Sequence, residues 1–343
     1  MTFATTPRDS FLNSDRSQRR DEPQASMTAA PCQRASLLGT DYRRMAALIH
    51  AGKDIEACRL WRDITPFGGL LAFLGDPEAE HACPALPKEH PFPGALLMRH
   101  LAALHPDILH LPLSGLPRSG RNAVVIGSGP AGLQAAWSLR EHGFDVSLLE
   151  AAPVAGMTLL HPPLRESASD APAFPPVPAE IVERIIAVLS LSGIVVKTAC
   201  PAGQADLARL CDSHDVVLCA CGIGAVLPAV QNGKVNDRLF AAGTCVKNKK
   251  HLGLLEAMVS GRNAAENAFR FLEHLPMKET DSMTPPLRNT SKASSENASG
   301  YDRPGESCML SRQSILDATS PCLACGHADE EGYGVVPDQL QKP

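Results

Sequence analysis

Six consecutive residues near the middle of the chain have the types and spacing needed to hold the diphosphate of a nucleotide. They are Gly127, Ser128, Gly129, Pro130, Ala131 and Gly132. The Gly-x-Gly-x-x-Gly spacing is that of dinucleotide-binding proteins. Gly127 permits a tight turn, Gly129 leaves room for a diphosphate, and Gly132 lets a helix pack closely on a sheet. Pro130 suits the first turn of that helix, whose free N–H groups and dipole attract an anion.

An acidic residue, Glu150, follows Gly127 by 23 positions. At this distance a carboxylate accepts hydrogen bonds from the adenosine ribose and repels a 2′-phosphate, so the site disfavours NADP. The apolar runs at 123–126 and 146–149 predict two strands, and the pattern from the glycines to His142 predicts a helix between them. Strand, helix, second strand and acidic residue together predict a βαβ dinucleotide-binding unit.

The elements around this unit predict an α/β fold class with two ordered domains. Further strands are predicted at 194–197, 215–220 and 238–242, and helices at 181–191, 204–210 and 254–275. Because strands alternate with helices, we expect a parallel, doubly wound, Rossmann-like sheet over residues 119–276. Upstream, helices predicted at 41–51, 54–62 and 94–104 form a small helical domain over residues 39–118.

Composition limits the other possibilities. Residues 1–38 and most of 277–343 are polar, so both segments are predicted to be disordered. The net charge of −5 comes from mixed acidic and basic residues, which argues against a nucleic-acid partner. No apolar run reaches the length of a membrane span, so no membrane insertion is expected. Eleven cysteines without a secretory pattern predict reduced thiols in the cytoplasm.

The order of these pieces, from about residue 41 to residue 275, resembles the flavin-binding portion of the glutamate synthase small-chain family. This FAD-dependent pyridine nucleotide-disulfide oxidoreductase family includes the flavin and NADPH module of dihydropyrimidine dehydrogenase. The residues that carry the resemblance are the glycines of 127–132, Glu150 followed by Gly156, the strand that ends in Gly222, the Ala-Ala-Gly turn that ends at Gly243, and the helix around Gly261. The resemblance implies that the 127–132 loop and Glu150 hold the ADP half of FAD. It also implies that Gly243 and Thr244 lie near the ribityl chain, with Gly156 and Gly222 completing the cofactor-binding set.

The chain departs from this family at several places. The family inserts an NADPH-binding domain after the strand that here ends in Gly222, but only 17 residues, Ile223 to Leu239, are present before Phe240. This number is too small for a domain, so the NADPH domain is predicted to be missing. Cys83 is the only cysteine between Thr65-Pro66-Phe67 and the glycine loop, which predicts a helical domain without the family's iron–sulfur clusters.

Two single-residue departures bear on FAD itself. Thr244 stands where the family has an aspartate that binds the ribityl chain, and Met157 stands where it has a second glycine. Loss of a charged partner weakens a hydrogen bond by about 1 to 2 kcal/mol. FAD is therefore expected to bind, with reduced affinity.

Several cysteines have spacings that could make them reactive or metal-binding groups. Cys322 and Cys325 form a CxxC near the C-terminus, which is half of a structural zinc set, so they are weak metal candidates and free thiols are preferred. Cys219 and Cys221 point to the same face of a predicted strand and are expected to be small core residues rather than a redox pair. Cys245 would approach the flavin if Gly243 does.

The sequence therefore predicts an FAD-binding oxidoreductase module that transfers electrons between partner redox proteins or subunits and has no NADPH site of its own. No catalytic acid or base can be named. A catalytically silent scaffold or regulatory subunit is an alternative, which Thr244, Met157 and the missing cluster cysteines favour. A small NAD-dependent dehydrogenase is a further alternative, against which the Pro130-Ala131-Gly132 sequence and the Ala-Ala-Gly turn both argue.

Overall fold

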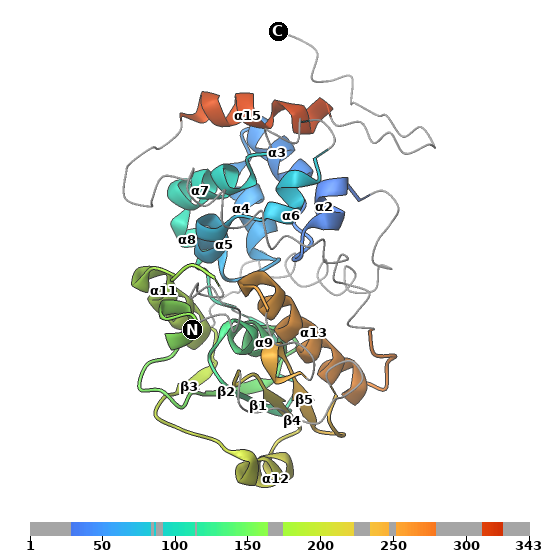
Figure 1. The fold of residues 1–343 in the computed structure, drawn as a ribbon. Coiled ribbons are helices and arrows are strands. Elements are labelled where there is room, and N and C mark those ends of the chain that lie inside the picture. Colours follow the sequence, from blue (N-terminus) through green and yellow to red (C-terminus); the bar gives the residue numbers. More distant parts are fainter. Residues whose placement is uncertain are drawn as a thin grey trace, which may run out of the picture.

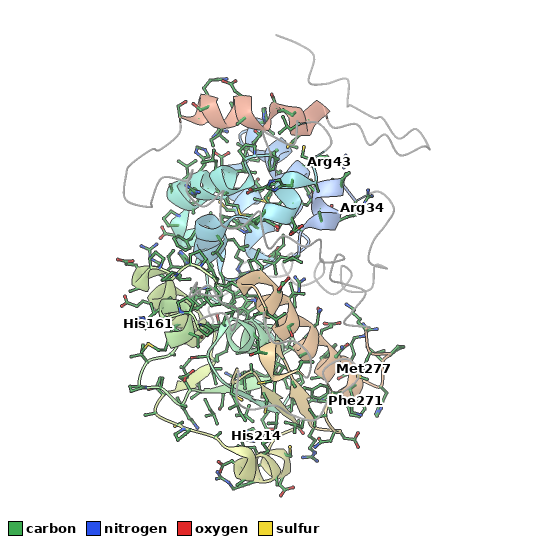
Figure 2. All side chains as sticks on the ribbon, in the orientation of Figure 1. Arg34, Arg43, His161, His214, Phe271 and Met277 are labelled. Carbon is green, nitrogen blue, oxygen red and sulfur yellow. The ribbon has the colours of Figure 1, made fainter. Side chains whose placement is uncertain are left out.

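The computed structural model describes residues 29–83, 86, 92–113, 115–163, 174–222, 234–246, 252–278 and 311–324. A layer of helices lies against one face of an α/β layer (Figure 1). The helical layer contains α2 (Pro31–Ala35), α3 (Tyr42–His50), α4 (Asp54–Arg62), α5 (Gly68–Leu74), α6 (Pro77–His81), α7 (Gly94–Leu104), α8 (Pro106–Leu109) and α15 (Arg312–Ala324). Side chains from both layers fill the space between them (Figure 2).

The α/β layer is built on a five-stranded sheet in which all pairings between the strands are parallel. Its strands are β1 (Asn122–Ile126), β2 (Asp145–Leu149), β3 (Val195–Lys197), β4 (Val216–Cys219) and β5 (Leu239–Ala241). Their spatial order is β3-β2-β1-β4-β5. This is the order of the doubly wound dinucleotide-binding fold, so the predicted fold class is confirmed. The order reverses between β1 and β4, and a fold of this kind binds its ligand at that point.

The helices of this layer are α9 (Pro130–Glu141), α10 (Met157–Leu160), α11 (Ala179–Leu191), α12 (Gln204–Ser213) and α13 (Leu254–Leu272), with a short 3-10 turn, η2 (Gly243–Cys245). The strands alternate their side chains between two cores, as their period of two requires. Val125 joins the core shared with α9 and α13, whereas Val124 and Ile126 join a smaller core beneath α12. The sheet is thus covered by helices on both faces.

Most predicted elements are confirmed within a few residues. The helices predicted at 54–62 and 94–104 have those bounds in the structure. No helix is predicted between them, where the structure has α5 and α6. Helix α8 was also missed. Gly52 has a φ of 72°, a left-handed conformation that suits a residue just after a helix.

Two segments predicted to be disordered contain helices where the structure describes them. Helix α2 lies within 1–38, and its Cys32 is buried together with Leu38 after it. Helix α15 lies within 277–343 and packs on α3, and its Arg312 pairs with Asp54, the first residue of α4. The prediction for 1–38 was wrong at α2, whereas the tail was predicted to be disordered only for the most part, which α15 does not contradict. Polar composition hides the few well-placed apolar residues of such helices, for example Ile315, which is 1% exposed. Of the helices described, none is both long and apolar enough to cross a bilayer.

Candidate nucleotide-binding site

The glycine loop lies at the carboxyl end of β1, where the strand order reverses. Helix α9 begins at Pro130 directly after the loop. Gly129 is its N-cap, with an extended backbone (φ −69°, ψ 178°), and no side chain caps the helix end. The N–H groups of the first turn therefore have no side-chain acceptor and can bind an anion.

The three glycines meet different steric demands. A Cβ on Gly127 (φ +99°) would lie 2.5 Å from the carbonyl oxygen of Ala220, and a Cβ on Gly132 would lie 1.8 Å from that of Gly127. Both positions are therefore closed by the protein's own backbone. A Cβ on Gly129 would meet only Thr158 Oγ1, at 3.2 Å. Gly129 is thus the one of the three glycines at which an added Cβ would meet a side chain and no backbone.

Glu150 is held by donors from the protein. Its Oε2 accepts hydrogen bonds from the backbone N–H of Ser128, at 2.9 Å, and from the Ser128 hydroxyl. Its Oε1 accepts one from the backbone N–H of Ala152, at 2.8 Å. The Ser128 hydroxyl oxygen in turn accepts from the N–H of Gly156, at 2.8 Å. A carboxylate has about four acceptor positions, so one position on Oε1 is left for a ribose hydroxyl.

The other predicted site residues lie at the same edge of the sheet. A Cβ on Gly222, which follows β4, would lie 3.9 Å from Thr244 Oγ1 in the turn after β5. A Cβ on Gly243 would lie 3.0 Å from that of Ala131, and the N–H of Gly243 donates to Ser260 Oγ at 2.8 Å. The turns after β1, β4 and β5 therefore meet in one place, as the sequence predicts.

One contributor to this arrangement, Thr158, was missed by sequence reasoning; it lies opposite Gly129. Ser128 was predicted as part of the cofactor-binding loop, but its role of connecting Glu150 to Gly156 was not. Gly261 was named as a residue that carries the resemblance, but its close approach to α9, where a Cβ would lie 2.0 Å from the Ala131 carbonyl oxygen, was not predicted. The sequence carries no signal for the position of Thr158.

The predictions for the cysteines have mixed outcomes. Cys219 is buried in the smaller core, as expected, and burial raises the pKa of its thiol to about 12. Cys221 is exposed, so its assignment as a core residue was wrong. Cys322 is buried in α15, while Cys325 lies outside the described residues. Within the ranges that the structure describes, no three potential ligands cluster closely enough to hold a metal ion.

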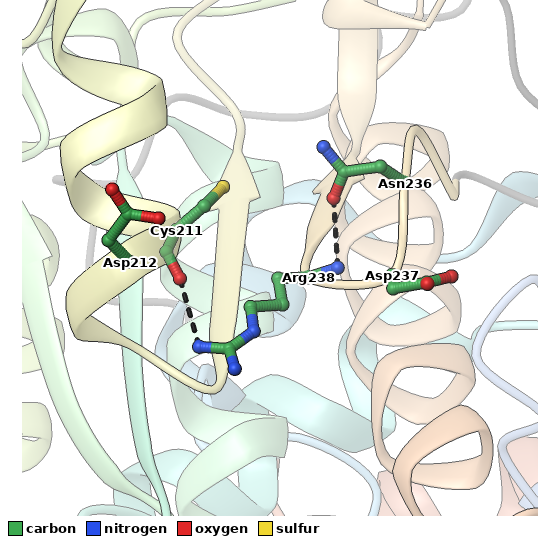
Figure 3. A pocket seen from close by; sticks show the side chains of 5 residues that line it. All are labelled: Cys211, Asp212, Asn236, Asp237 and Arg238. Atoms are coloured by element: carbon green, nitrogen blue, oxygen red, sulfur yellow. Dashed lines mark hydrogen bonds between the residues drawn. The ribbon is translucent and has the colours of Figure 1, made fainter.

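Two surface hollows lie at the opposite, amino edge of the sheet. One, of about 420 Å³, is lined by Cys211, Asp212, Asn236, Asp237 and Arg238 (Figure 3). Arg238 spans it and donates to the carbonyl oxygen of Cys211 at 3.0 Å. The other, of about 320 Å³, lies at the starts of β1, β2 and β3 and is bordered by His214, next to α12 (Figure 2). Neither hollow contains a residue of the glycine loop, so neither belongs to the predicted site.

Comparison with known proteins agrees with the fold and the loop. Residues 125–166 match the model of the NAD(P)-binding Rossmann-like domain. The chain is 28% identical over 205 residues to the NAD-dependent dihydropyrimidine dehydrogenase subunit PreT of Salmonella typhimurium and to its homologue in Salmonella typhi. The match covers 58% of this chain and 47% of each relative, so the chain spans about half the length of these proteins.

Likeness to solved structures is weaker. THI4 of Thermovibrio ammonificans is 16% identical, with a TM-score of 0.31, and the match covers 45% of this chain and 90% of that one. A ferredoxin reductase from Rhodopseudomonas palustris is 20% identical, with a TM-score of 0.21 and coverage of 47% and 43%. At these scores the likeness supports no statement about function. The strand order and the match over residues 125–166 establish a Rossmann-like fold.

Proposed function

We propose that the chain is an FAD-binding oxidoreductase module that passes electrons to or from a partner redox protein. The observation that carries the proposal is the uncapped start of α9 at Gly129, whose free N–H groups suit a diphosphate and where an added Cβ would meet a side chain and no backbone. The sequence similarity to a protein named as a dehydrogenase subunit supports both the oxidoreductase chemistry and the partner.

The residues present fit FAD. The first turn of α9 would hold the diphosphate, and the remaining acceptor position of Glu150 would take a ribose hydroxyl. The turn at Gly243, with Thr244, would lie along the ribityl chain, where Thr244 offers one hydroxyl instead of a charged group. Bound flavin supplies the redox chemistry, while the protein positions it and sets its environment. No residue of the chain is assigned as an acid or base.

We further propose that electrons reach the module from outside the chain. Strands β4 and β5 are direct parallel neighbours, with Val217 opposite Leu239. The connection between them, residues 220–238, has 19 residues, at the place where the family that the chain resembles holds an NADPH-binding domain. A partner protein would then have to supply or remove the electrons. The same proposal places the chain and this partner protein in the cytoplasm.

One observation favours the alternative, a nucleotide-fold scaffold without a cofactor. Three of the acceptor positions of Glu150 are already used by Ser128 and Ala152. Because the protein itself supplies hydrogen bonds to this carboxylate, the empty site costs less free energy than one in which the carboxylate has no donor. Direct measurement of binding separates the two functions.

The test is to titrate the purified full chain with FAD, NAD and NADP and to measure binding by calorimetry. Flavin absorbance that remains with the protein after gel filtration is a second measurement. Binding of FAD with retained absorbance supports the proposal. Binding of NAD alone would support a small dehydrogenase, and binding of neither would support the scaffold. Both of these results would overturn the FAD assignment.

A matched pair of variants ties the binding to the loop. Gly129 and Gly203 are both extended N-cap residues with negative φ, but a Cβ on Gly203 meets nothing within 4 Å. Gly129→Ala should weaken FAD binding about tenfold, which is ~1.4 kcal/mol, without unfolding the protein. Gly203→Ala should leave the affinity unchanged. Equal affinities of the two variants would show that the nucleotide does not lie beside Gly129.

A further inference from the structure

Two cysteines lie side by side at the carboxyl edge of the sheet. Cys221 follows β4, and Cys245 is the last residue of η2, after β5. Their Sγ atoms are 3.6 Å apart. The pair is 24 positions apart in the sequence, and it is the parallel pairing of β4 with β5 that brings the two residues together. No nucleotide-holding role requires either thiol.

The two thiols have different surroundings. Cys221 is exposed, whereas Cys245 is 0% exposed and belongs to the smaller core. The hydrogen bond from Cys245 lowers the pKa of the Cys221 thiol. The same hydrogen bond, together with burial, raises the pKa of Cys245. An accessible thiol that ionises easily, beside a buried one, is the arrangement found in reactive dithiols.

We propose that Cys221 and Cys245 form a redox-active dithiol that exchanges with low-molecular-weight disulfides. The Cys221 thiolate attacks one sulfur of the small disulfide, forms a mixed disulfide and releases one small thiolate. Cys245 then attacks Sγ of Cys221, and its proton passes to the departing small thiolate, which leaves as the second small thiol. One small disulfide is thereby reduced to two thiols, and the protein dithiol is oxidised to one disulfide.

The geometry needs little change for this reaction. To form the bond, the Sγ atoms must move from 3.6 Å to about 2.05 Å apart. The disulfide would join the turn after β4 to the turn after β5. It would also lie beside the glycine loop, because a Cβ on Gly127 would be only 2.9 Å from the Cα of Cys221. The reaction does not depend on which nucleotide binds there.

The test uses the reduced full chain, equilibrated with a series of oxidised and reduced glutathione mixtures. Each sample is quenched with acid and alkylated, and its disulfides are mapped by mass spectrometry. We expect a peptide pair linked through Cys221 and Cys245 to be the first disulfide to form. The proposal is overturned if both residues remain separately alkylated while other cysteines become linked, or if no disulfide forms.

Variants then separate the two roles. In Cys245→Ser the resolving thiol is missing, so glutathione bound at Cys221 should exceed the wild-type level by about tenfold. Cys221→Ser should abolish both the linkage and the mixed disulfide. Cys219→Ser is the matched control, since Cys219 is two residues away and buried, and it should leave the linkage unchanged. If the serine at 245 prevents folding, Cys245→Ala replaces it. No excess of glutathione at Cys221 in the folded variant would contradict the proposal.

Discussion

The three glycines at the start of α9 exclude a side chain for two different reasons. At Gly127 and Gly132 the excluded space is filled by backbone, whereas at Gly129 it borders a single hydroxyl. Sequence spacing identifies the set of glycines but cannot rank its members, because the ranking depends on atoms of Ala220 and Thr158 that lie far away in sequence. The structure therefore singles out Gly129 as the position where a substitution tests ligand binding rather than folding.

Gly261 provides a prediction about packing at the same scale. Replacing a helical glycine by alanine normally stabilises a helix by about 1 kcal/mol. At Gly261 the added Cβ would lie 2.0 Å from the Ala131 carbonyl oxygen, and forcing α13 away from α9 costs about 3 kcal/mol or more. Gly261→Ala should therefore lower the free energy of unfolding by at least about 2 kcal/mol, measured by urea denaturation.

The control for this prediction is Gly253→Ala. Gly253 is the N-cap of the same helix, and a Cβ there would lie 3.6 Å from Glu256 Oε2, an ordinary contact. The urea midpoint of Gly253→Ala should stay close to that of the wild type. If Gly261→Ala unfolds at the same urea concentration as this control, then α9 and α13 do not pack as closely as described.

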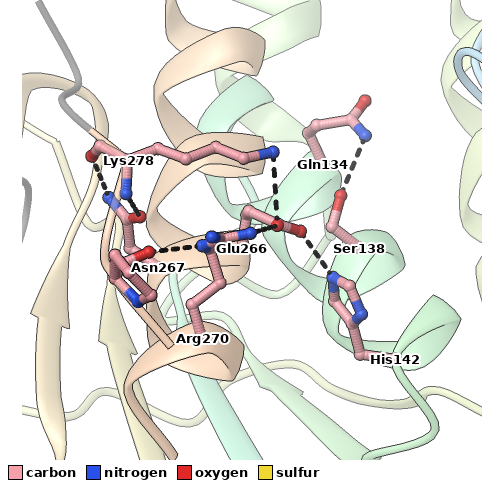
Figure 4. Close-up of polar contacts among 8 residues, drawn as sticks. Gln134, Ser138, His142, Glu266, Asn267, Arg270 and Lys278 are labelled. Atoms are coloured by element: carbon pink, nitrogen blue, oxygen red, sulfur yellow. Dashed lines mark hydrogen bonds and ion pairs between the residues drawn. The ribbon is translucent and has the colours of Figure 1, made fainter. Parts of the chain in front are cut away.

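Helices α9 and α13 are also joined by a polar network (Figure 4). Glu266 accepts a hydrogen bond from His142 Nε2 at 2.9 Å and lies 3.3 Å from Lys278 Nζ and 3.5 Å from Arg270. His142 stacks on Phe269 with ring centroids 4.0 Å apart. Burial raises the pKa of Glu266, but the interactions with His142 and Lys278 outweigh it and hold the pKa at about 2.

This network predicts a dependence of stability on pH. Because the folded-state pKa of Glu266 lies below its ordinary value of 4.5, the carboxylate stabilises the fold fully above that pH. The contribution should be lost as the pH falls from about 4.5 to about 2. Glu266→Gln should cost about 1 to 2 kcal/mol at pH 7 and less at low pH, as measured by thermal unfolding across this range.

Glu273→Gln is the matched control on the same helix end. Glu273 pairs with Arg121 at the surface, where its side chain is 41% exposed, so its removal should cost less than about 0.5 kcal/mol. A stability difference between Glu266→Gln and the wild type that stays constant from pH 7 to pH 2 would show that the carboxylate is not the group that titrates.

At the scale of elements, sequence reasoning succeeds where local signals agree with tertiary packing. The helix at Asp54–Arg62 has an acidic first turn and a basic last turn, and its bounds could be predicted. Helix α5 begins with two glycines and is apolar throughout, so local propensity argues against it although packing stabilises it. Helix α15 has Pro321 in its interior, which hid it in the same way. Contacts such as that between Cys221 and Cys245 depend on which strands become neighbours, which residue spacing does not show.

At the scale of the whole molecule, one core connects the two layers. It includes Trp61 and Phe67 of the helical layer, Trp137 of α9, and Ile315 of α15. The buried hydroxyl of Thr65 donates to Gln134 Oε1 at 3.3 Å across the same boundary. Because buried residues of both layers pack in one continuous core, we expect the two layers to unfold together. The helical layer is then part of one folding unit with the nucleotide-binding layer.

The two tryptophans allow this to be measured, because each layer contains one. In Trp61→Phe the fluorescence reports on α9 through Trp137, and in Trp137→Phe it reports on the helical layer through Trp61. In each variant the urea midpoint by fluorescence should agree with that variant's own far-UV circular dichroism midpoint within about 0.2 M. The comparison within one variant removes the effect of the substitution on overall stability. If the fluorescence midpoint differs from the circular dichroism midpoint, and the difference has opposite signs in the two variants, the helical layer unfolds independently. The nucleotide-binding layer would then have to fold on the core beneath α9 and α13 alone.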